Sequence, residues 1–370
     1  MKNKIIWLVV AVVVVGGVFA LRNKNSNPKS STLRVGAAVP LTGNYASIGE
    51  NIKKGFDLAK EQIESENSGM NVEIVYEDAC LPKDITSAVQ KLVNVDQLKI
   101  VNQFCAIGLV PSMEITEPNK VINVGVAANV SDLLGKKYYF SPNFSVEDNA
   151  NTLAEFAINK LKAKKVAFIF YNTQFGKDYR KYIGERIVES GGQIVADEMT
   201  SLETTDFRSH LIKVKNSKPD VIFVTQLTGA LGTIIKQSKD MGIDAPLVGN
   251  YQNEDPIVLS VAGEAAEGFI ISSADPMILS QNFSAFKSSF NRKYNIDPDV
   301  FASNAYDALK LEFEVFKKCG EDTDCMMDNL HKIVGYNGVS GSISIDENGF
   351  SSKPTIFKIV KGGKFVNLEQ

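Results

Sequence analysis

The feature that most constrains the fold is an alternation of strand-like and helix-like patterns that occurs twice along the 370-residue chain. After residue 33, short apolar runs alternate with stretches whose apolar residues, such as Ile48, Ile52 and Phe56, recur at helical spacing. This alternation is typical of β-α-β units and a parallel sheet. It begins again at 165–171 (KVAFIFY). Since the chain also exceeds the usual size of a single core, we expect an α/β protein with two lobes.

The periodicity places the elements of the two units as follows. In the first unit we expect strands at 33–39, 72–76, 100–104 and 121–124, and helices at 47–67 and 82–95. In the second unit we expect strands at 165–171, 193–197, 220–226, 246–249 and 268–272, and helices at 176–190, 205–216 and 229–241. A helix-rich segment at 283–318 and hairpin-like strands near 347–349 and 362–363 follow. Two such units facing each other leave a cleft where strands end and helices begin, and sheets of this kind bind ligands there.

Residues 1–32 have the composition of an export segment. Lys2 and Lys4 precede an unbroken apolar run at 5–21, and a polar stretch follows. Two interpretations are open. Cleavage after Ala20 would release a soluble periplasmic or cell-surface protein. Alternatively, the run stays as a short membrane anchor with a flexible tether, which the basic residues directly after it favour.

The rest of the chain is acidic, because removing the five basic residues of 1–31 takes the net charge from −3 to −8. Such a body has no electrostatic footprint for nucleic acid, so we expect no nucleic-acid partner. The sequence contains no P-loop, no G-x-S-x-G elbow, no H-E-x-x-H and no G-x-G-x-x-G after the first strand, and it has only two histidines. We therefore expect no enzyme activity, no catalytic residue and no cofactor.

An exported chain with four cysteines is expected to form disulfides. Cys319 and Cys325 lie in a polar stretch and are predicted to form a local disulfide. A metal site that includes His331 is the alternative, but it lacks the fourth ligand with which zinc sites usually close. We therefore expect no bound metal.

Four segments occur in a recognisable order along the chain. They are 39–43 (VPLTG), 78–82 (DACLP) with 104–105 (FC), 334–341 (VGYNGVSG) and 346–349 (DENG). In this order they resemble the leucine/isoleucine/valine-binding family of type I periplasmic binding proteins, over residues 33–366. The resemblance implies a Venus-flytrap fold, in which two Rossmann-like lobes with parallel-type sheets are joined by three hinge crossovers. It places lobe one at 33–144 and 276–338 and lobe two at 145–275 and 339–370, after the export segment 1–32.

The resemblance also implies a function. Such a protein is an extracytoplasmic solute-binding protein that captures a small molecule by closing its lobes about the hinge. Its partner would be an ABC-type permease in the membrane that reads the closed shape, and the protein itself is expected to be a monomer. The alternative is a ligand-sensing extracytoplasmic receptor subunit that acts with a separate signalling partner.

The resemblance implies a disulfide between Cys80 and Cys105 and a set of ligand contacts at strand ends and helix starts. The predicted ligand-binding residues are Ile48, Phe104, Ala106, Ile107, Ala127, Ala128, Asn129, Phe175, Gln226, Leu227, Tyr251 and Glu254. The family commonly has hydroxyl side chains where this chain has Ala106 and Ala128, and an ammonium-binding acid where it has Tyr251. Glu254 could supply a carboxylate, or it and Asp255 could cap the helix that follows.

Burying a charged ligand group without partners costs several kcal/mol. The missing side chains therefore predict a less polar or differently charged small molecule as the ligand. An amino acid is the second possibility.

Overall fold

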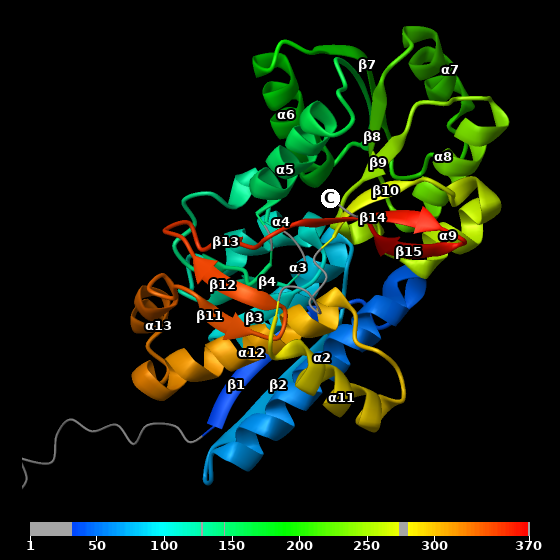
Figure 1. The fold of residues 1–370 in the computed structure, drawn as a ribbon. Coiled ribbons are helices and arrows are strands. Elements are labelled where there is room, and N and C mark those ends of the chain that lie inside the picture. The colour runs from blue at the N-terminus through cyan, green and yellow to red at the C-terminus, as the bar shows by residue number, and fades with distance from the viewer. Residues whose placement is uncertain (1–31, 127–128, 144, 274–279, 369–370) are drawn as a thin grey trace, which may run out of the picture.

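The computed structural model describes residues 32–126, 129–143, 145–273 and 280–368. Within them the chain forms two α/β lobes (Figure 1). The sequence-based prediction of the fold class is thereby confirmed. The predicted export segment falls outside these residues, except for Thr32. No helix in the described ranges has the length and apolar content needed to cross a membrane.

The first lobe is built on a parallel five-stranded sheet in the order β2-β1-β3-β4-β5. Its strands are β1 (Thr32–Val39), β2 (Asn71–Asp78), β3 (Ile100–Gln103), β4 (Ile122–Gly125) and β5 (Tyr139–Phe140). Its helices are α2 (Ala46–Glu66), α3 (Pro82–Gln90), α4 (Ala106–Thr116), α11 (Phe283–Tyr294), α12 (Val300–Cys319) and α13 (Thr323–Leu330). The predicted helix-rich segment at 283–318 forms the two helices α11 and α12.

Helices α2 and α12 come from distant parts of the sequence and pack closely against the same core. Gly55 of α2 permits this approach, because a Cβ atom there would lie 2.2 Å from the carbonyl oxygen of Ala302 in α12. Phe56 and Ile63 of α2 are fully buried in the core that the two helices share. The close packing of α12 on α2 therefore depends on the absence of a side chain at Gly55.

The second lobe is built on a seven-stranded sheet in the order β15-β14-β10-β9-β8-β6-β7. Its strands are β6 (Lys165–Tyr171), β7 (Gln193–Thr200), β8 (Val221–Thr225), β9 (Leu247–Gly249), β10 (Ile270–Ser273), β14 (Ile356–Lys361) and β15 (Lys364–Asn367). Strand β14 pairs antiparallel with both β10 and β15 at one edge, and the other pairs of this sheet are parallel. Its helices are α5 (Val146–Asn159), α6 (Gln174–Glu189), α7 (Arg208–Ser217), α8 (Thr228–Asp240) and α9 (Pro256–Ala262).

The apolar run of β6 is explained by helices on both faces of its sheet. Phe168 packs into a core with α5 and α6, whereas its neighbour Ile169 packs into a core with α7, α8 and α9. Because alternate residues of a strand point to opposite faces, every residue from Val166 to Tyr171 is buried.

The chain passes between the lobes three times, after β5, after β10 and before β14. A small sheet of β11 (Tyr336–Gly338), β12 (Gly341–Ile345) and β13 (Ser351–Ser352) precedes the last passage. Ile343 and Ile345 of β12 belong to the core of the first lobe, although the sequence division placed 339–370 in lobe two. The reason is that β12 pairs with β11, which keeps it beside α12. The lobe boundaries as a whole stay a prediction, and residues 144 and 276 lie outside the described ranges.

The third passage is fixed to the first lobe by a buried lysine. Lys353 is 5% exposed and donates to Asn304 Oδ1 of α12 at 3.0 Å and to Ser340 Oγ at 2.6 Å. The Ser340 hydroxyl in turn donates to the buried carboxylate of Asp307 at 2.5 Å. Burial lowers the pKa of Lys353 to about 8, although the Asp307 carboxylate opposes the shift. Buried hydrogen bonds and opposite charges therefore hold the third crossover against the first lobe.

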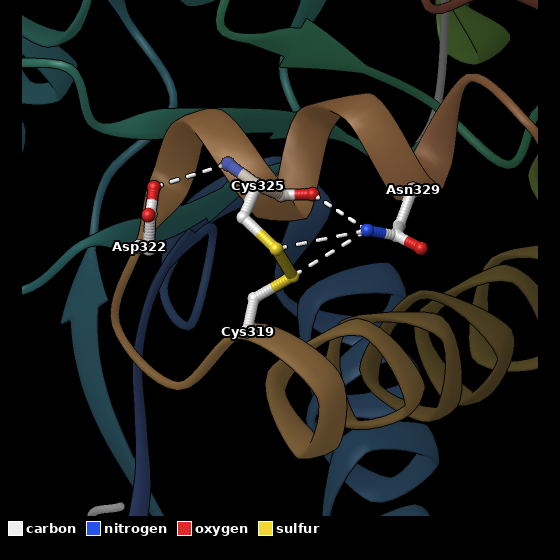
Figure 2. Close-up of a disulfide and its surroundings, with 4 residues drawn as sticks. All are labelled: Cys319, Asp322, Cys325 and Asn329. Carbon is white, nitrogen blue, oxygen red and sulfur yellow. Dashed lines mark hydrogen bonds between the residues drawn. A yellow bond between two sulfur atoms is a disulfide. The ribbon is translucent and has the colours of Figure 1, made fainter. Parts of the chain in front are cut away.

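Both predicted disulfides are present. Cys80–Cys105 joins the residues after β2 to the start of α4, and Cys319–Cys325 joins the end of α12 to α13. Figure 2 shows the second of them with Asp322, which caps α13 by accepting the N–H of Cys325 at 3.0 Å. Asn329 donates to the carbonyl of Cys325 at 2.9 Å. In the described part of the chain no cluster of His, Cys, Asp and Glu could hold a metal ion.

Candidate functional site

A cavity of about 480 Å³ lies between the two lobes. This size is within the range of small-molecule sites. The first lobe contributes Tyr45, Cys80, Leu81, Phe104, Cys105, Ile107, Val110, Val130 and Asp132 to its walls. The second contributes Tyr171, Asn172, Thr173, Gln174, Phe175, Leu202, Glu203, Leu227 and Gln252.

Four helices begin at this cavity, two from each lobe. The residues that precede them as N-caps are Tyr45 for α2, Cys105 for α4, Thr173 for α6 and Leu227 for α8. Thr173 caps its helix by accepting the N–H of Gly176 at 3.3 Å. The other three residues make no side-chain cap hydrogen bond in the described structure. Because the first N–H groups of a helix carry partial positive charge, the cavity attracts an anionic group.

The described residues that line the cavity include four aromatic side chains and no basic one. Tyr45, Phe104, Tyr171 and Phe175 supply four rings. Burial raises the pKa of the Tyr45 hydroxyl, and the nearby carboxylate of Asp255 adds to this rise, so Tyr45 is a neutral hydroxyl at pH 7. Among the described residues that line the cavity, Asp132 and Glu203 are the charged ones, and both are exposed. The cavity thus combines an apolar body with backbone donors rather than cationic side chains.

Four of the residues predicted from the sequence line this cavity: Phe104, Ile107, Phe175 and Leu227. Phe104 follows β3 and packs edge-on against Phe301, with the ring centroids 5.2 Å apart. Phe175 lies in the first turn of α6 and is 3% exposed. Local structure places each residue at the end of its own parallel sheet, and the packing of the two lobes brings them to the same cavity.

Two predicted residues, Gln226 and Glu254, are bound within the protein instead. Gln226 donates to Thr200 Oγ1 at 2.7 Å inside the second lobe. Glu254 pairs with Lys358 at 2.5 Å and accepts the Ser273 hydroxyl at 2.5 Å. Neither residue is among those that line the cavity.

The predicted alternative role, capping of the next helix, belongs to Asp255 alone. It accepts the N–H of Ile257 at 2.7 Å at the start of α9.

The remaining described candidates are also outside the lining. Ile48 packs against the core of the first lobe. Asn129 is 1% exposed and its Oδ1 accepts the hydroxyl of Tyr139 at 2.7 Å. Tyr251 is 2% exposed, and Asn143 Nδ2 donates to its hydroxyl at 3.3 Å. Asn129 and Tyr251 lie beside the first crossover between the lobes. The role of all three residues as ligand contacts stays a prediction.

Three alanines were also predicted as ligand contacts. Ala106 is the first residue of α4, next to the lining residues Cys105 and Ile107. Ala127 and Ala128 lie outside the described residues.

Sequence reasoning missed the larger part of the cavity wall. Asn172, Thr173 and Gln174 directly precede the predicted Phe175, so the position of the strand end was a usable signal for them. Leu202 and Glu203 follow the edge strand β7, and only the fold brings them to the cavity. Tyr45 was missed because the prediction looked one turn later, at Ile48.

Comparisons with known proteins agree with this geometry. A family model described as "Periplasmic binding protein" matches residues 32–364. The leucine-, isoleucine-, valine-, threonine-, and alanine-binding protein of Pseudomonas aeruginosa is 23% identical over 326 residues, which cover 86% of this chain and 87% of that protein.

Two solved structures share the fold over nearly their whole length. The branched-chain amino acid transporter substrate binding protein LivJ of Streptococcus pneumoniae, in complex with isoleucine, has a TM-score of 0.81 and 26% identity, with 90% of this chain and 97% of that chain covered. A solute binding protein of an ABC transporter from Rhodopseudomonas palustris, in complex with 3,4-dihydroxy benzoic acid, has a TM-score of 0.79 and 25% identity, with coverages of 92% and 97%.

Proposed function

The chain belongs to the periplasmic binding protein family, and from this premise we propose that it is the solute-binding component of an ABC-type importer that captures a small carboxylate with an apolar, aromatic body. Membership implies an extracytoplasmic location and a binding rather than a catalytic role. The three passages between the lobes would act as the hinge about which the lobes close. A permease in the membrane would then bind the closed form.

The observation that carries the proposal is the convergence of four helix starts on a cavity whose described lining has no basic side chain. A carboxylate is stabilised by such backbone donors. A ligand bearing only positive charge is disfavoured by the same helix ends.

The aromatic lining favours a planar or otherwise apolar body. Tyr45 and Phe104 from the first lobe face Tyr171 and Phe175 from the second across one cavity. Ring pairs of this kind gain about 0.5–1.5 kcal/mol beyond the apolar area that they bury. A ligand ring between the lobes would therefore stabilise the closed form, because the ring contacts both lobes only when the cleft is narrow.

An α-ammonium group finds fewer partners. Tyr251 stands where an acid was expected, and its hydroxyl is buried and bound by Asn143. Glu254 is neutralised by Lys358. The lining carboxylates Asp132 and Glu203 are exposed, where solvent weakens their attraction for an ammonium. A carboxylate without an ammonium, as in the aromatic acid bound by the R. palustris protein, is therefore favoured over an amino acid such as the isoleucine bound by LivJ.

Thermal unfolding with a matched set of compounds tests this proposal. The protein is first freed of retained ligand by denaturation and refolding with its disulfides intact. We expect benzoate to raise the midpoint of unfolding, benzamide to raise it little because the carboxylate is removed, and phenylalanine to raise it less than 3-phenylpropionate. Equal stabilisation by benzoate and benzamide would contradict the anion site, and stronger stabilisation by phenylalanine or isoleucine would instead support an amino-acid ligand.

A variant pair locates the binding. Phe175→Leu should abolish most of the benzoate effect. Phe365→Leu lies in β15, at the edge of the seven-stranded sheet of the second lobe and outside the cavity lining. This control should leave the stabilisation by benzoate unchanged.

A further inference from the structure

A buried carboxylate joins the two lobes beside the cavity. Asp178 of α6 is 1% exposed. It accepts the backbone N–H of Ser131 at 2.7 Å and the hydroxyl of the same residue at 2.8 Å. Ser131 begins a short 3₁₀ helix (Ser131–Leu133) between β4 and β5 of the first lobe. Both hydrogen bonds are therefore donated by the first lobe and accepted by the second.

This contact is continuous with the cavity wall. Gln174 lines the cavity and donates to Asp178 Oδ1 at 2.8 Å and to Ser131 Oγ at 3.1 Å. The residues on either side of Ser131, Val130 and Asp132, also line the cavity. The segment 130–132 of the first lobe is thus held against α6 at the point where both contribute to the site.

The surroundings make the carboxylate dependent on these donors. Val130 and Leu133 pack in one buried apolar cluster with Phe175 and Tyr179 of α6. In the described structure no basic side chain forms an ion pair with Asp178. Its charge is balanced only by neutral donors and by its place near the start of α6. Hydrogen bonds to an ionised acceptor are about twice as strong as those between neutral groups, so each lost donor weakens the contact substantially.

We propose that Ser131, Asp178 and Gln174 form a latch that holds the lobes at this angle and positions the segment 130–132 in the cavity wall. Asp178 is then a positioning residue, which sets the balance between open and closed lobes without a place in the cavity lining. This inference rests on the proposed function for its meaning, but it does not depend on which ligand binds.

The test measures the distance between the lobes in the protein freed of ligand. All four cysteines of the chain are in disulfides, so cysteines introduced at the exposed positions Lys83 and Thr205 accept nitroxide labels selectively. The two positions lie near Leu81 and Glu203 in the two cavity walls. Electron–electron dipolar spectroscopy then reports the distribution of interlobe distances.

Three variants are compared in this labelled background. Asp178→Asn replaces one acceptor oxygen by a donor. Ser131→Val and Ser131→Thr have the same shape, but only threonine keeps the hydroxyl. We expect the population with the lobes at the observed angle to fall about tenfold relative to other lobe angles in D178N, by a smaller factor in S131V, and not at all in S131T. A tenfold change corresponds to about 1.4 kcal/mol.

Hydrogen exchange gives a second readout, because the Ser131 amide is itself a donor in the latch. Its exchange should be faster in D178N than in S131T. Distance distributions that are identical in D178N and the parent, or equal shifts in S131V and S131T, would overturn the proposal. If D178N does not fold, the valine–threonine pair decides the question.

Failure of the latch and failure of the proposed ligand class are distinguishable. The distance measurement uses no ligand, whereas a benzoate titration of the unlabelled parent tests the ligand class alone.

Discussion

Replacing Glu312 by glutamine should remove a large pH dependence from the stability of the protein. Glu312 lies on α12 and is fully buried in the first lobe. In the described structure neither of its carboxyl oxygens has a hydrogen-bond partner. Burial raises the pKa of Glu312 to about 8, and the neighbouring Asn102 side chain opposes this shift only in part. Among the described residues no charged group offsets this rise in the pKa of Glu312.

The sign and size of the effect follow from proton linkage. Between the ordinary pKa of 4.5 and about 8, the folded chain holds a proton on Glu312 that the unfolded chain has lost. Stability therefore falls as the pH rises through this window, by up to about 1.4 kcal/mol per pH unit. From pH 5 to pH 8 the contribution of this group to the free energy of unfolding falls by about 3 kcal/mol.

Glutamine resembles the protonated acid in shape and carries no titrating proton. Glu312→Gln should match the parent at pH 5 and exceed its free energy of unfolding by about 3 kcal/mol at pH 8. Guanidinium unfolding at pH 5, 6, 7 and 8, followed by circular dichroism, measures the free energy of unfolding of the parent and of E312Q. The control is Glu314→Gln on the same helix, where the exposed carboxylate pairs with Lys317 at 2.7 Å and should contribute less than about 1 kcal/mol at any pH. An E312Q variant that is less stable than the parent at pH 8 would refute the reasoning.

Further predictions concern the crosslinks and the buried lysine. Replacing Cys80 and Cys105 by serine should lower the free energy of unfolding by about 3 kcal/mol in the chain-entropy model and weaken ligand binding, because both cysteines line the cavity. Replacing Cys319 and Cys325 by serine, which opens a much shorter loop, should cost about 2 kcal/mol and leave binding unchanged by calorimetry; an equal loss of binding would contradict the assignment of the cavity. Lys353→Met should destabilise the fold by about 3 kcal/mol in guanidinium unfolding at pH 7, since it leaves the buried aspartate of α12 without a counter-charge, and a neutral effect would show that this network is dispensable.

The fold could be predicted because its signals are local. The strand at 165–171 and the helices that cover it have the periodicity of a sheet buried on both faces. The disulfide between Cys319 and Cys325 was also predictable, since six positions separate its partners. Leu227 was found because it ends a predicted strand at the cleft, and Phe175 because the resembled family often has an aromatic residue at that position.

The rest depended on contacts between distant residues. Glu254 was a reasonable ligand candidate until the fold placed Lys358, 104 positions away in sequence, 2.5 Å from its carboxylate. Strand β12 was assigned to the second lobe because nothing local shows that Ile343 and Ile345 complete the core of the first. The contact between Ser131 and Asp178, 47 positions apart, gives no pattern in the sequence at all.

The most direct test of the central claim is mass spectrometry of the protein purified under native conditions, with the retained small molecule released by unfolding and identified. The convergence of helix starts and aromatic rings on the cavity predicts a small aromatic or apolar carboxylate without an ammonium group. A branched-chain amino acid held at one molecule per chain, or a ligand that carries no carboxylate, would contradict it.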